Sequence, residues 1–474
     1  MDSGAFLSRE RHQKNGLAVL LFLLLLLLWV YEVDTMKCLL TDPHALPHES
    51  YQPGDLIVGA LVSHYSHCSH DFSFKEHPLQ EFSDFITVVT KFYQHILSLV
   101  FATKEINENP NILPNVTLGF NIYDSYNAAH ITYRTTLELL FKSHRLVLNY
   151  NCESHKKTLA IVGALASKTS FLMADILTLY KIPQLTYGSF ASAKSEMQQR
   201  PSFYRIVANE DPQYMGIINL LKHFGWTWVG FFVVDDESGE HFMETMEPLL
   251  SQNGICSAFT RQIPSQEHFH YSKAYTVSQI FTLLKARIIV LYGKPFTIIA
   301  IQHYITLSTL EQKTNALVGK VWITTAQSDF VLASINQGGN LQMFQGALSF
   351  MIHSSEIPGF QEFLQTIKPD WTEADDFLKD FWQEAFNCFI PDLRMPYKMS
   401  GTCTGEERLE SLIGPFFEMC MSGYSYGIYN AIYAVAHALH ALYLSRSYQR
   451  CTGASKRDLQ DLQPWQVMFP QLNE

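Results

Sequence analysis

The sequence predicts an α/β protein with two doubly wound, mostly parallel sheets. A chain of 474 residues is too long for one ordinary hydrophobic core, so two domains or lobes are expected. Short apolar runs alternate with stretches of helical periodicity along most of the chain. Residues 159–190 carry an apolar run, a small-residue turn, an amphipathic stretch and a second apolar run. That order within about thirty residues indicates a βαβ crossover between parallel strands.

The first half of the chain has the alternating pattern of one doubly wound sheet. Residues 51–54 form a turn before the first strand, residues 64–74 are polar and read as a loop, and the helix at 92–108 ends before Pro110, because a residue that precedes proline avoids the α conformation. The expected elements are strand 55–62, helix 92–108, strand 118–123, helix 128–144, strand 159–163, helix 169–181 and strand 182–187.

A second run of the same pattern starts near Val207 and predicts the other sheet. Its expected elements are helix 213–224, strand 227–234, turn 235–239, helix 240–252, strand 255–263, helix 271–286, strand 288–292, helix 296–308 and strand 321–325. The remaining chain predicts strand 346–351, helices 359–367 and 373–386, a polar insertion at 389–412 and a long helix at 424–448. Right-handed crossovers would place the loops of this second sheet on one edge, facing the first.

The N-terminus has the pattern of a signal peptide, which we expect to occupy residues 1–36. Arg9, Arg11 and Lys14 precede the apolar run 17–30, which is short for a membrane span of about 20 residues. The alternative is an uncleaved anchor. Either reading places the rest of the chain in the secretory pathway or outside the cell, where disulfides form.

Two further features bear on this environment. Asn115-Val116-Thr117 is a glycosylation sequon, so Asn115 is an expected glycan site unless the sequon is unused. The formal net charge of −11 argues against binding to a phosphate backbone as the main task.

The loops that follow the strands of the βαβ unit are the best candidates for a ligand site. Ligands of open α/β sheets lie beyond the carboxyl ends of the strands, next to helix N-termini. Ser167 falls in the first such loop and Ser189 follows the second strand. Free backbone N–H groups at the first position could hold a carboxylate. The alternative is that Ser167 merely caps a helix.

Three chemical patterns are better explained without catalysis or metal binding. Residues 423–427 spell G-x-S-x-G but open a helix instead of following a core strand, so no hydrolase is expected. His64, His67, Cys68 and His70 have a spacing that a metal could use, but they share one expected loop. The acidic run 235–237 reads as a solvated turn rather than a cation site. We therefore expect no enzyme, no cofactor and no metal.

Several motifs together resemble the extracellular Venus-flytrap domain of class C G-protein-coupled receptors, especially that of the vomeronasal type-2 (pheromone) receptors. They are YQPGDLIVGALV at 51–62, FATKEINENPNILPNVTLGFNIYDSY at 101–126, the βαβ unit, HFGWTWVGFFVVDDESGEHF at 223–242, VWITTAQSDF at 321–330, FWQEAFNCFIP, CTGEERLESL and YNAIYAVAHALHALY. The resemblance covers residues 51 to about 465.

The resemblance implies a bilobed, periplasmic-binding-protein-like fold with two lobes joined by a hinge. The first lobe would comprise residues 37–207 and a return segment 345–450, the second lobe residues 208–344, and residues 451–474 would be an incomplete tail. The family's cysteine-rich and seven-helix membrane domains are not in this sequence. Coupling to a G protein would need that missing membrane domain.

The resemblance also implies ligand-binding positions in the first lobe and at the hinge. Ser167 matches a hydroxyl that holds a ligand carboxylate in amino-acid-binding relatives, and Ser189 matches a backbone contact. Phe190 stands where those relatives carry a second hydroxyl. Glu210, with Asp211 beside it, matches an acid that holds the ligand amine, although Glu210 can also be read as a solvated loop acid.

Two positions of the second lobe differ from those relatives. Ser238 replaces a stacked tyrosine and Ala326 replaces an acid. A free amino acid and a peptide or protein therefore both stay open as ligands.

For the 8 cysteines, the resemblance implies one disulfide, between Cys388 and Cys403. Cys256 matches a cysteine that relatives bond to the cysteine-rich domain, so it is expected to be unpaired here. Cys152 matches an intermolecular bridge or is a free surface thiol. The sequence does not pair Cys38, Cys68, Cys420 or Cys451.

The sequence thus predicts the ligand-binding region of a vomeronasal class C receptor. It would bind an amino-acid-like, peptide or protein cue by closing its lobes, and it would dimerise through helices of the first lobe, especially 128–144. The alternative is a stand-alone secreted solute- or peptide-binding protein. An enzyme would need turnover that disappears in a Ser425→Ala variant.

Overall fold

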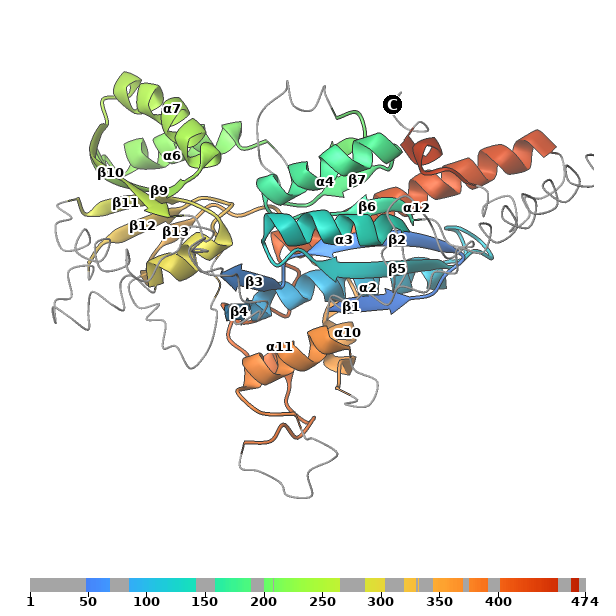
Figure 1. Cartoon of the computed structure of the whole chain (residues 1–474). Coiled ribbons are helices and arrows are strands. Elements are labelled where there is room, and N and C mark those ends of the chain that lie inside the picture. Colours follow the sequence, from blue (N-terminus) through green and yellow to red (C-terminus); the bar gives the residue numbers. More distant parts are fainter. Residues whose placement is uncertain are drawn as a thin grey trace, which may run out of the picture. The chain divides into compact units, whose positions relative to one another are not determined.

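The structure is a computed structural model of the chain (Figure 1). It describes residues 48–68, 85–141, 158–188, 200–207, 209–264, 286–302, 319–329, 331, 344–369, 375–390, 401–450 and 462–468. The expected signal peptide, the helix expected at 271–286 up to residue 285, and most of the expected tail lie outside these residues.

The first sheet has six strands in the order β1-β5-β2-β6-β7-β8. The strands are β1 (Glu49–Gln52), β2 (Leu56–Val62), β5 (Leu118–Asp124), β6 (Thr158–Val162), β7 (Gln184–Thr186) and β8 (Phe203–Arg205). All neighbours pair in parallel except β1, which runs antiparallel to β5 along the edge. The order β5-β2-β6 shows that the chain leaves the central strand β2 in one direction and later crosses to its other side. That reversal is the mark of a doubly wound sheet.

Helices cover both faces of this sheet because successive strand residues point to opposite faces. One face packs Leu61 and Ile161 against Met173 and Leu177 of α4 (Ser167–Tyr180), with α3 (Ala129–Phe141) beside it (Figure 1). The other face packs Val58 and its neighbours against α2 (Tyr93–Glu108), α10 (Phe360–Thr366), α11 (Asp376–Phe386) and α12 (Gly423–Arg450). Strands buried on both faces explain why the sequence shows continuous apolar runs instead of alternation.

The second sheet has five parallel strands in the order β10-β9-β11-β12-β13. They are β9 (Trp228–Asp235), β10 (Cys256–Pro264), β11 (Ile288–Tyr292), β12 (Val321–Thr324) and β13 (Leu348–Ser349). The helices α6 (Asp211–His223) and α7 (Glu237–Gln252) cover it through Ile217, Ile218, Phe242 and Met246, which are fully buried. The sheet is again doubly wound, since the chain passes from β9 to β10 and then back across to β11. The fold class expected from the sequence is therefore confirmed.

The His-rich segment after β2 is not the loop that the sequence predicts. Residues Tyr65–Cys68 form β3, which pairs antiparallel with β4 (Phe85–Val88). A short 3-10 helix, Thr90–Phe92, then leads into α2. His64 and His67 are buried, and burial lowers the pKa of His64 to about 3. The polar composition of this segment was misleading because His64 and His67 are buried, and His64 packs in the core as a neutral side chain.

Other boundaries differ from the predictions by a few residues, as is usual for helix ends. Residues 51 and 52 lie in β1, so only Pro53 and Gly54 remain in the expected turn. Helix α7 begins at Glu237, inside the segment expected to be a turn. The strand β8 was not predicted, because three residues are too short for a period to show. Of the helices in the described ranges, none is long and apolar enough to cross a membrane.

Candidate ligand-binding site

The strongest candidate site is a cavity formed where the carboxyl ends of both sheets meet. Its wall comes from the loops after β5, β6 and β7 of the first sheet and after β9, β11 and β12 of the second, joined by α12. Polar side chains of both sheets and of α12 line it, namely Ser167, Glu210, Ser238, Tyr292, Lys294, Gln327 and Tyr424. This is the location that the topology predicts for a ligand in a doubly wound α/β protein.

On the first sheet, the cavity meets the N-terminus of α4. Ser167 is the first residue of this helix, and the N-cap is Ala166, whose side chain cannot accept a hydrogen bond. Ser167 is therefore not the side-chain cap that the alternative interpretation assumed. Leu165 and Ala166 line the same wall, so the N-terminus of α4, where backbone N–H groups have no acceptor within the helix, lies at the cavity. The arrangement suits an anionic group of a ligand.

Glu210 gives the cavity a buried carboxyl group. The residue is only 4% exposed, so its interpretation as a solvated loop acid is wrong. Its Oε2 atom accepts hydrogen bonds from the Tyr292 hydroxyl at 3.1 Å and from Gln327 Nε2 at 2.5 Å. Burial raises the pKa of the Glu210 carboxyl above its ordinary value, while the hydrogen bond from Tyr292 acts in the opposite direction. A buried carboxyl in a cavity is a strong candidate for binding a cationic group.

An ion pair between Asp236 and Lys294 lies at the start of α7. Asp236 is the N-cap of this helix, and its Oδ1 accepts from the Gly239 N–H at 3.1 Å and from the Ser238 hydroxyl. Its Oδ2 forms an ion pair with Lys294. Burial alone would raise the pKa of Asp236, but Lys294 and these hydrogen bonds hold it below its ordinary value. Asp236 is thus a structural cap and ion-pair partner, not the solvated turn residue that the sequence suggests.

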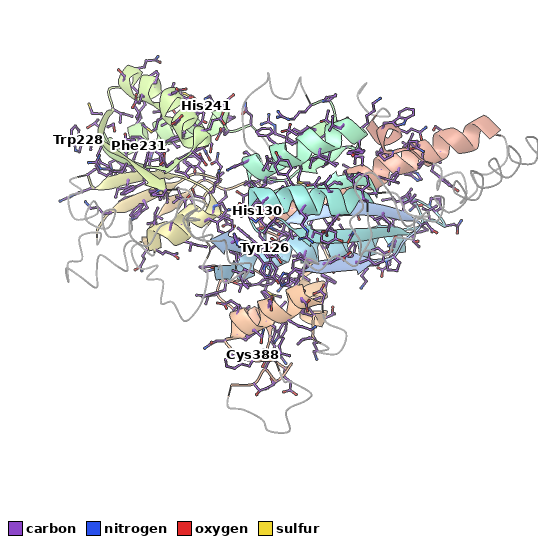
Figure 2. All side chains as sticks on the ribbon, viewed as in Figure 1. Tyr126, His130, Trp228, Phe231, His241 and Cys388 are labelled. Carbon is purple, nitrogen blue, oxygen red and sulfur yellow. A yellow bond between two sulfur atoms is a disulfide. The ribbon has the colours of Figure 1, made fainter. Side chains whose placement is uncertain are left out.

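A larger cavity of about 880 Å³ adjoins the first and shares Ser167, Glu210, Ser238 and Lys294 with it. Its walls are helix α4, through residues such as Phe171 and Leu172, and helix α7, where His241 is located (Figure 2). The volume is at the upper end of the range typical of small-molecule sites, about 300–1,000 Å³. The site therefore has a small inner compartment with the buried carboxyl and a roomy outer one.

Two other described residues expected at the site, Asp211 and Ala326, do not line the inner cavity. Asp211 is exposed and accepts from Asn209 Nδ2, and Ala326 uses its N–H to bond Gln213 Oε1 at 2.7 Å. Ser189 lies outside the described residues. Ser167, Glu210 and Ser238 are the expected positions that the structure brings together.

Sequence reasoning missed Tyr292, Lys294, Gln327 and Tyr424, which all line the inner cavity. Tyr292 and Gln327 lie at or just after the ends of β11 and β12, so the rule about carboxyl ends could have identified them. Tyr424 had no such signal, because it is near the start of a long helix far away in sequence. Only the tertiary structure brings it to this wall.

The motif resembling a hydrolase nucleophile has a structural role here. Ser425 is fully buried in the first turn of α12, where its hydroxyl donates to Gln94 Oε1 at 2.7 Å. Among the described residues, which exclude His70 and the side chain of Cys68, no group of three or more histidines, cysteines or acids is placed to hold a metal ion.

The described cysteines follow the expected arrangement. Cys388, which Figure 2 labels, is joined to Cys403 by a disulfide. Cys256 and Cys420 are free and exposed. Cys38, Cys152 and Cys451 lie outside the described residues, as does the side chain of Cys68.

Comparison with known proteins agrees with this geometry. Residues 97–473 match the family described as "Receptor family ligand binding region". The chain is 30% identical to vomeronasal type-2 receptor 26 of Mus musculus, over 82% of this chain and 45% of that receptor. It is 27% identical to the extracellular calcium-sensing receptor of Bos taurus, over 93% of this chain and 42% of the receptor. It is also 25% identical to taste receptor type 1 member 2 of Canis lupus familiaris, over 88% of this chain and 47% of that receptor.

The chain thus spans less than half the length of these relatives. The family match covers the second sheet, strands β5 to β8 of the first sheet and all of the residues that line the candidate site. The fold, the cavity and the family match point to one conclusion. The chain belongs to the receptor family ligand binding region, and it corresponds to the extracellular ligand-binding domain of class C G-protein-coupled receptors.

Proposed function

We propose that this chain is the extracellular ligand-binding region of a vomeronasal-type receptor and that it binds an amino-acid-like or peptide cue in the cavity between its two sheets. The observation that carries the proposal is the cavity itself. Both sheets contribute the carboxyl ends of their strands to it, and Glu210 supplies a buried carboxyl group there. The similarity to a vomeronasal type-2 receptor supports the choice among class C receptors.

The chemistry of the cavity favours a ligand with groups of both charges. The N-terminus of α4 suits an anion, whereas Glu210 suits a cation. An amino acid, or one end of a peptide, carries both. The outer cavity of about 880 Å³ leaves room for more than one residue of a peptide.

Binding would act by lobe closure. A ligand that contacts α4 on one side and the loops of the second sheet on the other stabilises the closed arrangement over the open one. In a complete receptor this population shift would be the signal. The lobes would comprise residues 37–207 with 345–450, and residues 208–344; the first would also provide a dimer face through α3.

The test is a thermal-shift screen of the secreted chain against the standard L-amino acids and a set of short peptides. We expect at least one ligand to raise the Tm of the wild type and to lose that effect in Ser167→Ala and Glu210→Gln. The matched controls Ser257→Ala and Glu247→Gln change exposed residues that do not line either cavity, and they should retain the shift.

A ligand-induced shift that survives in both Ser167→Ala and Glu210→Gln would refute this assignment of the site. Sequencing the transcript beyond the codon for Glu474 tests the receptor context separately. A continuation that encodes a cysteine-rich segment and seven apolar spans would support it.

A further inference from the structure

The carboxyl group that should receive the ligand already has a partner inside the protein. Gln327, which follows β12, donates its Nε2 amide to Glu210 Oε2 at 2.5 Å. Both residues are buried, at 7% and 4% exposure, and both line the inner cavity. With the Tyr292 hydroxyl at 3.1 Å, the same oxygen accepts two hydrogen bonds. The Oε2 atom of Glu210 therefore already has two donors from within the protein.

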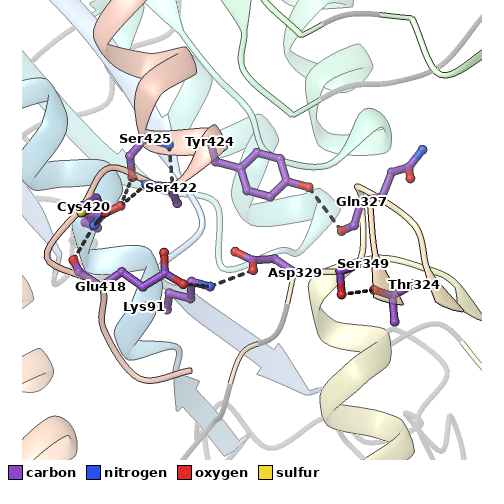
Figure 3. A network of polar contacts seen from close by, with 11 residues as sticks. Lys91, Thr324, Gln327, Asp329, Ser349, Glu418, Cys420, Ser422, Tyr424 and Ser425 are labelled. Atoms are coloured by element: carbon purple, nitrogen blue, oxygen red, sulfur yellow. Dashed lines mark hydrogen bonds and ion pairs between the residues drawn. The ribbon is translucent and has the colours of Figure 1, made fainter. Parts of the chain in front are cut away.

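The loop that carries Gln327 is held on several sides. Its side-chain Oε1 accepts from Gln213 Nε2 at 3.1 Å, and its backbone oxygen accepts from the Tyr424 hydroxyl at 3.2 Å. Figure 3 shows the Tyr424 phenol directed at Gln327 from α12. These contacts keep the amide of Gln327 in place at Glu210.

The same loop is tied to the first lobe two residues later. Asp329 forms an ion pair with Lys91 at 2.7 Å, and Lys91 also contacts Glu418 at 2.8 Å (Figure 3). Lys91 is almost fully buried, so this pair is poorly screened by solvent. Neither Lys91 nor Asp329 lines the cavity, which makes the tie accessible to mutation without touching a bound ligand.

A ligand ammonium group that binds Glu210 Oε2 would compete with the Gln327 amide for that atom. An ammonium ion is the stronger partner, because hydrogen bonds between two charged groups are stronger than those with a neutral donor. Displacing the amide leaves a buried donor and acceptor that need new partners, and that cost is subtracted from the affinity of the ligand.

We propose that Gln327 is an internal competitor of the ligand, which occupies Glu210 in the empty site and must be displaced by a ligand amino group. The proposal rests on the proposed function, because it concerns the same site. Gln327 would thus lower the affinity of every ligand whose amino group binds Glu210. A ligand that makes few other contacts in the cavity would not displace it.

The direct test replaces Gln327 with methionine, which keeps the length of the side chain but removes its donor. The probes are the standard L-amino acids and their N-acetyl derivatives, which lack the amino group. Binding is measured by calorimetry at about pH 8, where ordinary carboxyl groups are ionised. We expect the Kd of amine-bearing probes to fall about tenfold in Gln327→Met, the scale of one hydrogen bond to a charged group, and that of the acetylated probes to change less than twofold.

The matched control is Gln252→Met, the same change at an exposed residue at the end of α7. Its Kd values should equal those of the wild type. Asp329→Asn is the second variant and guards against misfolding of Gln327→Met, since it loosens the loop from outside the cavity. We expect a smaller gain in the same direction, and only for probes with an amino group.

The outcomes separate this proposal from the proposed function. If amine-bearing probes bind the wild type and Gln327→Met equally, Gln327 is not a competitor, while the site itself stands. If peptides bind but no probe gains affinity in either variant, the inference is likewise overturned and the receptor function remains. If nothing binds the wild type or any variant, both fail.

Discussion

At the scale of single residues, Glu210 combines a cost in stability with a role in binding. Its pKa is raised because burial disfavours the charged form. A carboxyl whose folded pKa lies above its unfolded value of about 4.3 favours the folded state at low pH and loses that contribution as pH rises through the folded pKa. Above the folded pKa the ionised group therefore costs stability.

We predict that Glu210→Gln raises the Tm at pH 7 and that its advantage over the wild type shrinks as the pH is lowered toward 4. Scanning fluorimetry across this range measures the difference, with the exposed Glu247→Gln as control. A variant that is less stable than the wild type at pH 7 would show that the Glu210 hydrogen bonds outweigh its desolvation.

Asp236 shows the opposite sign. Lys294 and the α7 cap hold its pKa below the ordinary value, so it stabilises the fold above an unfolded pKa of about 3.9, and this contribution is lost as pH falls through the folded pKa. Asp236→Ala should cost about 1 kcal/mol or more at pH 7, the usual penalty for removing an N-cap. Asp236→Asn keeps a cap and should cost less. Urea unfolding of both variants separates the contribution of the helix cap from that of the ion pair with Lys294. If both variants lose the same free energy of unfolding, the cap contributes nothing.

At the scale of elements, a close approach of two glycines fixes the turn between β1 and β2 against β5. A Cβ atom at Gly119 would lie 2.4 Å from the Gln52 backbone oxygen and 2.6 Å from the Gly54 nitrogen. Gly119→Ala should therefore destabilise the protein by about 1–3 kcal/mol. Gly414→Ala, where the nearest atom would be 3.9 Å from the new Cβ, should be close to neutral in the same unfolding assay. If Gly119→Ala costs no more stability than Gly414→Ala, the backbone around Gly119 shifts at little cost to accommodate the added methyl group.

The disulfide between Cys388 and Cys403 closes a loop of 15 residues after α11. A loop of that length restricts the unfolded chain enough to contribute about 3 kcal/mol. The double variant Cys388→Ser with Cys403→Ser should lose up to this amount, measured by urea unfolding of non-reduced protein. The free, exposed Cys256 provides the control, since Cys256→Ser should leave stability unchanged.

At the scale of the whole molecule, the family implies passage through the secretory pathway. Asn115 is exposed in the loop before β5, where an oligosaccharide would meet solvent. We predict that the chain expressed in mammalian cells carries one glycan on Asn115, so that an N-glycosidase lowers its apparent mass and Asn115→Gln removes the effect. Secreted protein without a glycan would mean that the sequon is unused.

The amount that could be predicted differs between the fold and the site. Buried parallel strands and amphipathic helices have characteristic local patterns of apolar residues. For this reason β2, β9 and α6 were predicted nearly to the residue. The strand β3 was not, because His67 and the preceding His64 read as solvated although both are buried. At the site, the position of Ser167 follows from the local strand–turn–helix pattern. The surroundings of Glu210 include Tyr292 and Gln327, which are 82 and 117 residues away in the sequence.

The sequence by itself determined the α/β class, the order of the elements, the disulfide partners implied by family resemblance and one edge of the site. Each of these rests on interactions between near neighbours or on motifs that the chain spells out. Only the tertiary structure decided which side chains meet in the cavity, that Asp236 pairs with Lys294, and that the Gln327 amide donates a hydrogen bond to Glu210. The physical reason is that such contacts join loops from different strands, and no local pattern records the distance between them.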